Sequence, residues 1–242
     1  MKAKERLIVA LDVDTREEVE FLVDALKDEI GMFKVGLQLF TSMGSEIIRY
    51  IKIRGGKVFL DLKLHDIPNT VSETVRVLTK VGVDMMNVHS QGGLEMMRLA
   101  KETSLKTAKE EGLEPPLLIA VTILTSLGDE EVQQIGYPRS AREMVGELGQ
   151  LAQKAGLDGV VCSPLEAGII RNTCGNDFIT VTPGVRPAGG DVGDQKRITT
   201  PGKAIAGGST YIVVGRPITK APDVREAARS IVAEMEREGE EG

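Results

Sequence analysis

Residues 57–66 read KVFLDLKLHD, an apolar stretch in which charged residues take every second position towards its end. This alternation is typical of a β-strand, where successive side chains point to opposite faces. Shortly after it, Pro68 opens a segment over 68–80 whose apolar residues are spaced as in a helix. The stretch therefore predicts a strand that is followed at once by a helix.

The same pair of elements repeats along the whole chain. Short apolar runs predict eight strands, at residues 6–12, 32–37, 57–64, 85–90, 117–124, 159–162, 178–184 and 211–216. Helical spacing follows each strand, near residues 15–28, 42–54, 68–80, 92–110, 139–155, 163–171, 200–206 and 222–237. Strict alternation of strands and helices implies a parallel sheet.

Such a sheet can be a closed barrel or a doubly wound open sheet. Eight units in 242 residues, with polar residues at nearly every strand end, favour the closed barrel. We therefore predict the α/β class and a single (β/α)8 TIM barrel with parallel strands.

Composition sets limits on the kind of protein. The length suits one barrel, so we predict a single domain over residues 1–242, with an acidic tail, 234–242, that frays in solvent. The net charge of −6 argues against a general nucleic-acid surface. No signal segment opens the chain, no apolar run reaches the roughly 18 residues that span a membrane, and two cysteines are too few for a disulfide framework. A cytoplasmic protein without membrane contact is the expectation.

Charged residues gather where the predicted strands end. Asp12 ends the first strand, Lys34 lies on the second, and Asp61 and Lys63 alternate with leucines on the third, with Asp66 just beyond. Reactive groups in barrels belong at these carboxyl ends, and the alternation points Asp61 and Lys63 into the barrel mouth. A buried structural ion pair explains the two alone, but the further charges of Lys34 and Asp66 favour a reactive cluster.

The second half of the chain predicts an anion site. TPGVRP at 182–187 ends the seventh strand, and VVGRP at 213–217 closes the eighth. The connection 185–199 between them also contains Gly189-Gly190 and Gly193-Asp194-Gln195. Glycine lets backbone N–H groups approach phosphate oxygens, and arginine adds charge-assisted hydrogen bonds. In barrels, phosphate is often held at these two positions, so a phosphate site is predicted here.

Taken together, the motifs resemble those of the orotidine 5′-monophosphate decarboxylase family, in its type 1, bacterial form. The matching segments are 10–12, 33–36, 61–70, 121–126, 158–163, 182–187, 194–195 and 214–217. The resemblance implies a carboxy-lyase that converts orotidine 5′-monophosphate (OMP) to UMP and carbon dioxide, the last step of de novo UMP biosynthesis. It implies no metal and no organic cofactor, and it implies a homodimer.

The resemblance also implies roles for single residues. Lys63 should protonate C6 of the pyrimidine within a network of Lys34, Asp61, Lys63 and Asp66, with Asp66 and Thr70 reaching into the partner's site. Asp12, Lys34 and the 61–70 segment should bind the ribose, and Thr125 the pyrimidine. The loop 185–199 should close over the phosphate. The remaining expected substrate contacts are Ile67 and Pro183, and for the phosphate Arg186, Gln195, Gly215 and Arg216.

Two alternatives stay open from the residues alone. A Mg²⁺-dependent keto-sugar-phosphate decarboxylase or aldolase of the same barrel family could use Asp61 and Asp66 as ligands, although Lys63 between them argues against it. A non-catalytic barrel that binds a phosphate ligand gains little from carboxylates near an anion. His65 shares the face of the leucines, which favours a supporting role, whereas His89 ends the fourth strand and can face the site.

Overall fold

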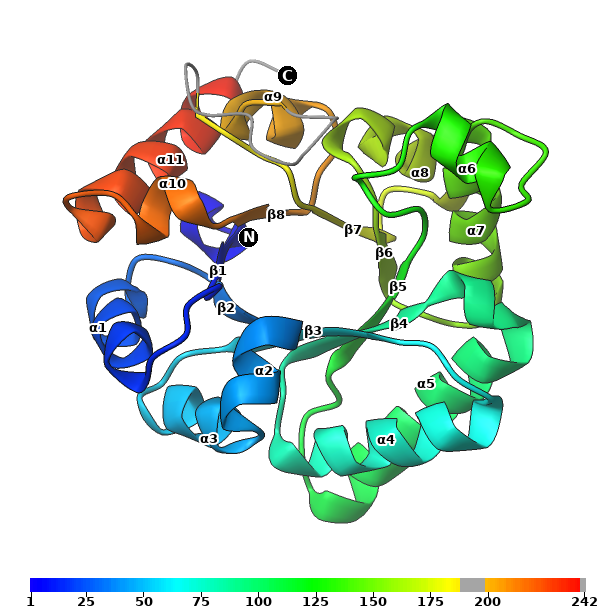
Figure 1. Cartoon of the computed structure of the whole chain (residues 1–242), viewed down its shortest axis with the longest axis horizontal. Helices are drawn as coiled ribbons and strands as arrows, with labels where there is room; N and C mark the ends of the chain where they lie inside the picture. Colours follow the sequence, from blue (N-terminus) through cyan, green and yellow to red (C-terminus); the bar gives the residue numbers. More distant parts are fainter. Residues whose placement is uncertain (188–198, 240–242) are drawn as a thin grey trace.

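The computed structural model describes residues 1–187 and 199–239, in which eight parallel strands form a closed barrel in the order β1 to β8. Figure 1 shows the strands inside a ring of helices that follows the chain around the barrel. The strands β1 to β8 span Leu7–Ala10, Met32–Gly36, Val58–Leu64, Met85–His89, Leu117–Val121, Gly159–Val161, Ile179–Thr182 and Tyr211–Val214. The predicted fold class is confirmed.

Helices follow each strand in the described part of the chain. Helices α1 to α11 span Arg16–Leu26, Leu37–Met43, Glu46–Ile53, Pro68–Val81, Gly93–Glu111, Asp129–Gln134, Ala141–Lys154, Ala167–Cys174, Pro201–Ala206, Arg216–Thr219 and Val224–Gly239. Short 3-10 turns η1 to η3 lie at Ala3–Arg6, Ser90–Gly92 and Pro164–Glu166.

The helices depart from the prediction in several places. The segment predicted over 42–54 starts earlier and is two helices, α2 and α3, which are separated at Gly44 by a left-handed backbone with φ of 61°. The short helices α6 and α10 were not predicted. Helix α11 continues to Gly239 and buries Met235, so the predicted tail 234–242 overlaps the end of this helix. Residues 240–242 lie outside the described residues.

The apolar core has two layers, as the strand alternation requires. One cluster fills the barrel itself and includes Ile8, Phe59 and Val213, while a larger cluster, which includes Leu60 and Val214, lies between the strands and the helices. Burying each such aliphatic side chain contributes about 1.5–3 kcal/mol. The inner layer fills the barrel below its mouth, so reactive groups at the mouth lie directly above packed apolar side chains.

At the amino-terminal end of the barrel, the charges are structural. Asp84 precedes β4, accepts a hydrogen bond of 2.8 Å from the N–H of Val58 and pairs with Lys52 at 2.7 Å. Asp158 precedes β6 and pairs with Lys101 in the same manner at 2.6 Å. Each carboxylate accepts a hydrogen bond from an N–H at or next to the start of a neighbouring strand, from Val58 in the case of Asp84 and from Leu118 in the case of Asp158.

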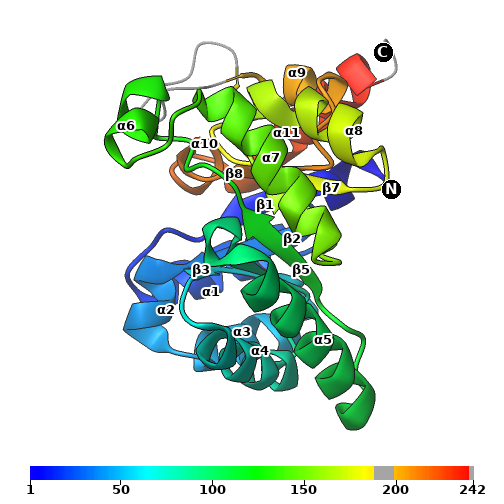
Figure 2. The same ribbon diagram turned by 90° about the vertical axis from the view of Figure 1, so that its right-hand side faces the viewer.

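The carboxyl ends of the strands lie at the opposite end of the molecule. In Figure 2, α2 and α6, which follow β2 and β5, stand on the side away from the N-terminus. No helix among the described residues is long and apolar enough to cross a membrane.

Candidate active site

The barrel brings to one mouth residues that are far apart in the sequence. Because β8 pairs with β1, the ends of β7, β8, β1, β2, β3 and β4 lie next to one another in that order. The predicted phosphate residues follow β7 and β8, and the predicted charged cluster follows β1 to β3. The two predicted halves of the site are therefore neighbours across the β8–β1 seam.

The centre of the mouth is an ion-pair network of two lysines and two aspartates. Lys63 Nζ lies 2.7 Å from Asp61 Oδ1, and Lys34 Nζ lies 3.6 Å from Asp61 Oδ2 and 3.2 Å from Asp12 Oδ1. The side chains of Lys34 and Asp61 are only 13% and 14% exposed, whereas that of Lys63 is 32% exposed and that of Asp12 is 55% exposed. The structure thus brings together four of the predicted residues, with the Lys63 ammonium on the open side of a buried pair.

Burial alone would raise the pKa of the Asp61 carboxyl. The ammonium groups of Lys34 and Lys63, with hydrogen bonds from Lys63 and Asn87, outweigh it and hold that pKa below its ordinary value. Asp61 is therefore an anion throughout the neutral range, and it fixes a positive charge on each side of itself.

A glycine makes room for this network. Gly36 pairs with Asp61 across β2 and β3, and its backbone φ of −95° is open to any residue. A Cβ at this position would lie 2.9 Å from Lys34 Nζ. The missing side chain leaves space for the Lys34 ammonium between its two carboxylates.

The end of β3 is irregular at the residue expected to act as the acid. Lys63 is the only non-glycine residue with positive φ in the described chain, at 53°, and the register between β3 and β4 shifts between Leu60 and Leu64. At this point Asn87 of β4 forms hydrogen bonds with two residues of β3. Its Nδ2 donates to Asp61 Oδ1 at 2.7 Å, and its Oδ1 accepts from Lys63 N at 2.8 Å. Sequence reasoning missed Asn87, although an amide within the apolar run of β4 was a visible signal.

The residues at the end of the matching segment 61–70 lie outside the ion-pair network of this chain. Asp66, Ile67 and Thr70 are exposed, and Asp66 accepts a hydrogen bond of 2.7 Å from the N–H of Ile67. The described residues of this chain offer Asp66 no ion pair. Within the described residues, Asp66 therefore does not join the ion-pair network of Lys34, Asp61 and Lys63.

The predicted phosphate residues flank the same mouth. Pro183 and the buried Gly184, with φ of 78°, follow β7, and the half-buried Arg186 donates to the carbonyl of Val185 at 2.9 Å. Gly215 and the exposed Arg216 follow β8. A Cβ at Gly215 would lie 3.8 Å from Asp12 Oδ2, so this turn borders the ion-pair network.

Two further predicted contacts stand apart. Thr125 is buried in the turn after β5. Gln195, with most of the loop 185–199, lies outside the described residues.

The two histidines of the chain stack at the edge of the site, with ring centroids 5.2 Å apart. His65 is exposed, whereas His89 is buried at the end of β4 and its Nδ1 has no hydrogen-bond partner among the described residues. Burial, helped by the nearby His65 and Lys63, lowers the pKa of His89 to about 4. His89 is therefore a neutral ring that packs beneath the site.

We expect His89 to stay neutral down to about pH 5, since protonation would bury a charge beside Lys63. In an NMR titration, the imidazole signal that is absent from a His89→Gln variant should show no protonation step between about pH 8 and pH 5. A His65→Gln variant is the matched control for the assignment. Because the unfolded state takes up this proton near 6.5 and the folded state near 4, stability should fall as the pH drops through that window. A midpoint near 6.5 for His89 would contradict the expectation.

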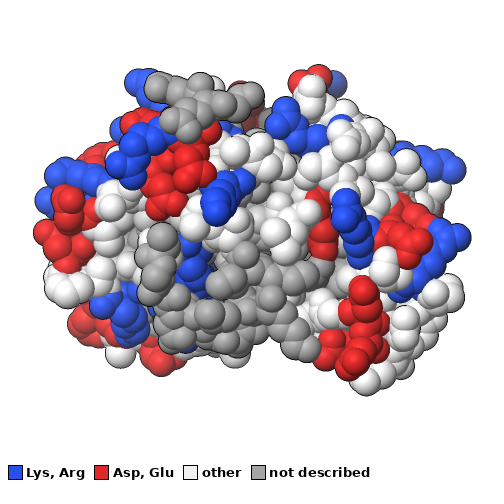
Figure 3. Space-filling view, turned by 90° about the horizontal axis from the view of Figure 1, so that it is seen from above, with Lys and Arg blue, Asp and Glu red and all other residues white. Residues whose placement is uncertain are grey.

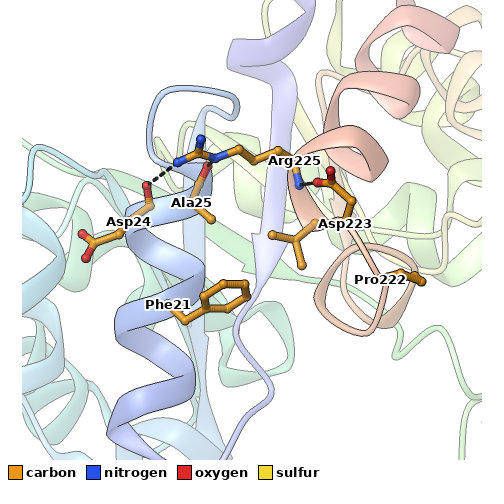
Figure 4. A pocket seen from close by; sticks show the side chains of 7 residues that line it. Phe21, Asp24, Ala25, Pro222, Asp223 and Arg225 are labelled. Carbon is orange, nitrogen blue, oxygen red and sulfur yellow. Dashed lines mark hydrogen bonds between the residues drawn. The ribbon is translucent and has the colours of Figure 1, made fainter.

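Other surface features do not resemble a reaction site. Within the described ranges, no group of three or more His, Cys, Asp and Glu side chains is placed to hold a metal ion. Figure 4 shows a pocket of about 440 Å³ at the seam of α1 and α11, where Arg225 donates to the carbonyl of Ala25 at 2.9 Å beside Phe21. On the face drawn in Figure 3, acidic and basic side chains are intermixed among the described atoms.

Comparisons with known proteins find extensive similarity over nearly the whole chain. The family described as "Orotidine 5'-phosphate decarboxylase / HUMPS family" matches residues 5–231 of the chain. The orotidine 5′-phosphate decarboxylase of Moorella thermoacetica is 51% identical over 237 residues, which cover 98% of this chain and 94% of that protein. That of Haemophilus influenzae is 50% identical over 226 residues, 93% of this chain and 96% of the relative. The crystal structure of orotidine 5′-phosphate decarboxylase from Lactobacillus acidophilus has a TM-score of 0.84 at 39% identity, covering 95% of this chain and 98% of that one.

Proposed function

The chain belongs to the orotidine 5′-phosphate decarboxylase / HUMPS family, and from this premise we propose how its side chains convert OMP to UMP and carbon dioxide. The activity is that of a carboxy-lyase of pyrimidine biosynthesis, as in the relatives of about 50% identity. The observation that carries the mechanism is the network in which Lys63 contacts a buried Asp61 that is shared with Lys34.

Lys63 acts as the proton donor. When carbon dioxide leaves C6 of the pyrimidine, the electron pair of the broken bond stays on the ring carbon. A fixed ammonium group beside that carbon stabilises the developing negative charge and then transfers its proton to it. The partly exposed Lys63 ammonium, which Asp61 holds at 2.7 Å, is suited to this role.

Asp61 and Lys34 hold the charge in place. In the proposed complex, Asp61 would also repel the carboxylate of the substrate. At 4 Å and an effective dielectric constant near 20, such repulsion is at most about 4 kcal/mol. Enzymatic accelerations need roughly 8–23 kcal/mol, so repulsion is a minor contribution and stabilisation of the carbanion-like state is the major one.

The remaining contacts fix the substrate. We assign the ribose to Asp12, Lys34 and the 61–70 segment with Ile67, and the pyrimidine to Thr125. The phosphate is assigned to the turns after β7 and β8, where the residues are Pro183, Arg186, Gln195, Gly215 and Arg216. Binding energy from the phosphate then holds C6 against Lys63, because remote contacts contribute to orientation at the reacting atom.

The activity is tested by following the absorbance change as OMP converts to UMP with EDTA present. Turnover that is insensitive to EDTA supports the proposed mechanism, and turnover that requires added Mg²⁺ would favour the keto-sugar-phosphate type of chemistry. A binding protein would give no turnover in either condition. Orotidine, which lacks the phosphate, is the second substrate: equal kcat/KM for OMP and orotidine would contradict the assigned role of the phosphate.

A homodimer in which Asp66 and Thr70 complete the partner's site is the second part of the proposal. Both residues are exposed in the single chain, and the carboxylate of Asp66 bonds only to the adjacent backbone among the described groups. Asp66 belongs to the matching segment 61–70 but lies outside the ion-pair network of its own chain. This placement fits a site built from two subunits.

Mixing two inactive variants should therefore restore activity. Asp66→Ala and Lys63→Ala should each lose nearly all turnover alone. In a coexpressed mixture, about half of the dimers are hybrids. Each hybrid has one site with both Lys63 and the partner's Asp66, so about a quarter of all sites are intact. The matched control mixes Lys63→Ala with Asp61→Asn, whose defects lie in the same subunit's site and cannot complement. Absence of recovery in the first mixture would place Asp66 in its own subunit's site or outside the reaction.

A cytoplasmic location and the absence of nucleic-acid binding belong to the same proposal. The acidic net charge of −6 and the mixed charges of Figure 3 support the second.

A further inference from the structure

We propose that Asn87, in the middle of β4, is a positioning residue for the decarboxylation, whose single side-chain amide holds both the Asp61 carboxylate and the backbone of Lys63. The inference rests on the proposed function, because the geometry it explains is that of the proposed proton donor. Asn87 is 1% exposed, so it acts through Asp61 and Lys63 and not by touching the substrate.

Both ends of the amide are used, and in one orientation only. Nδ2 donates to Asp61 Oδ1 at 2.7 Å, while Oδ1 accepts from the N–H of Lys63 at 2.8 Å. If the amide were turned over, its oxygen would face the carboxylate and its NH2 group would face the N–H. Both contacts would then be repulsive. The carboxylate and the N–H therefore fix the amide, and the amide fixes the distance between them.

The Asn87 amide also replaces a hydrogen-bond acceptor that the backbone of β4 does not offer to β3. Leu60 pairs with Met86 and Leu64 with Val88, so four steps along β3 correspond to two along β4. The residues between them leave the regular register, and Lys63 adopts φ of 53°. A left-handed backbone costs a lysine residue about 1–2 kcal/mol, and it persists only when the surrounding structure holds it. The Oδ1 atom of Asn87 supplies the acceptor that the backbone of β4 does not.

Asparagine is suited to this position because it combines a donor and an acceptor on a short side chain. Aspartate keeps the acceptor for Lys63 N–H but, when ionised, brings a second negative charge against Asp61. Alanine removes both bonds. The two substitutions therefore separate loss of the contacts from addition of charge.

Asn87→Ala should lower kcat by about 10- to 100-fold, the effect of losing a buried hydrogen bond to a charged group. KM should change by less than about threefold, since the amide does not touch the substrate. The matched control is Thr180→Val at the other end of the barrel, which removes the bond of 2.9 Å from the Thr180 hydroxyl to the carbonyl of Gly208. This variant should lose thermal stability and keep the kcat of the wild type.

Asn87→Asp should give a pH signature that a purely structural role would not. Burial and the neighbouring Asp61 raise the pKa of a carboxyl at this position. At acid pH its protonated form donates to Asp61 as the amide does, and at higher pH its anion repels Asp61. The ratio of variant to wild-type kcat should therefore fall as the pH rises, while the same ratio for Asn87→Ala stays flat.

Two outcomes overturn the inference while leaving the proposed function intact: wild-type turnover of OMP with unchanged kcat in Asn87→Ala, or a flat ratio for Asn87→Asp. If the wild type itself does not turn over OMP, the proposed function fails. A measurement without substrate then tests whether Asn87 holds the Asp61 carboxylate. In ¹³C NMR the carboxyl of Asp61 should titrate at higher pH in Asn87→Ala than in the wild type. An unchanged titration would show that the amide does not hold the carboxylate.

Discussion

Replacing Lys63 with alanine should lower kcat for OMP at least about 10⁴-fold, because the variant loses the proton donor and the charge that stabilises the carbanion-like state together. KM should change much less, since the phosphate and ribose contacts remain. The fold should survive, because the removed side chain is 32% exposed and Asp61 keeps its contact with Lys34 at 3.6 Å. Steady-state kinetics, with thermal unfolding of the same preparation, measures both effects.

The matched control for this variant is Lys57→Ala. Lys57 directly precedes β3, at the opposite end of the strand, and is exposed. Its removal also deletes one positive charge from the same part of the chain, yet turnover should stay within about twofold of the wild type. If Lys63→Ala were as active as Lys57→Ala, Lys63 would not be the proton donor.

Replacing Asp61 with asparagine should lower kcat by about 10²- to 10³-fold, the second largest effect. The substitution conserves shape but removes the negative charge that lies between two ammonium groups. Lys34 and Lys63 then repel each other, and Lys63 loses the carboxylate that holds it at 2.7 Å. Kinetics at saturating OMP tests the expectation.

Asp61→Asn should also change the pH dependence of stability. The pKa of this carboxyl is below its ordinary value in the folded protein, so the unfolded chain binds the proton more readily. Its contribution to stability is present above the ordinary pKa and is lost as the pH falls through the lower folded pKa. The variant should therefore show a shallower loss of stability on acidification than the wild type in denaturant unfolding.

Asp84→Asn is the matched control for the kinetic effect. Asp84 is paired with Lys52 at 2.7 Å at the amino-terminal end of the barrel, away from the mouth. Its substitution should cost stability and leave kcat unchanged. Equal kinetic losses in the two variants would mean that Asp61 is a structural ion pair of the same kind.

The sequence predicted where several side chains lie, because strand geometry decides their placement. The alternation along β3 pointed Asp61 inward and Leu60 outward, and both lie there. Parallel strands in a closed barrel then fix which ends are neighbours, so the described residues after β7 and β8 lie next to the charged cluster.

What the sequence did not predict depends on contacts between strands. Lysine has no preference for a left-handed backbone, so nothing local indicates the φ of 53° at Lys63. Asn87 becomes informative only once the register places it beside Asp61. Helix α6, Asp129–Gln134, is too short for its periodicity to stand out.

The left-handed backbone at Lys63 sets stability and activity against each other. Glycine or asparagine would adopt φ of 53° with less backbone strain. Evolution under selection for heat resistance alone should drift away from lysine at this position, and only selection for growth without a pyrimidine supply retains it. Libraries built for thermostability should therefore keep codon 63 fixed, since a change that relieves the backbone strain there also ends catalysis.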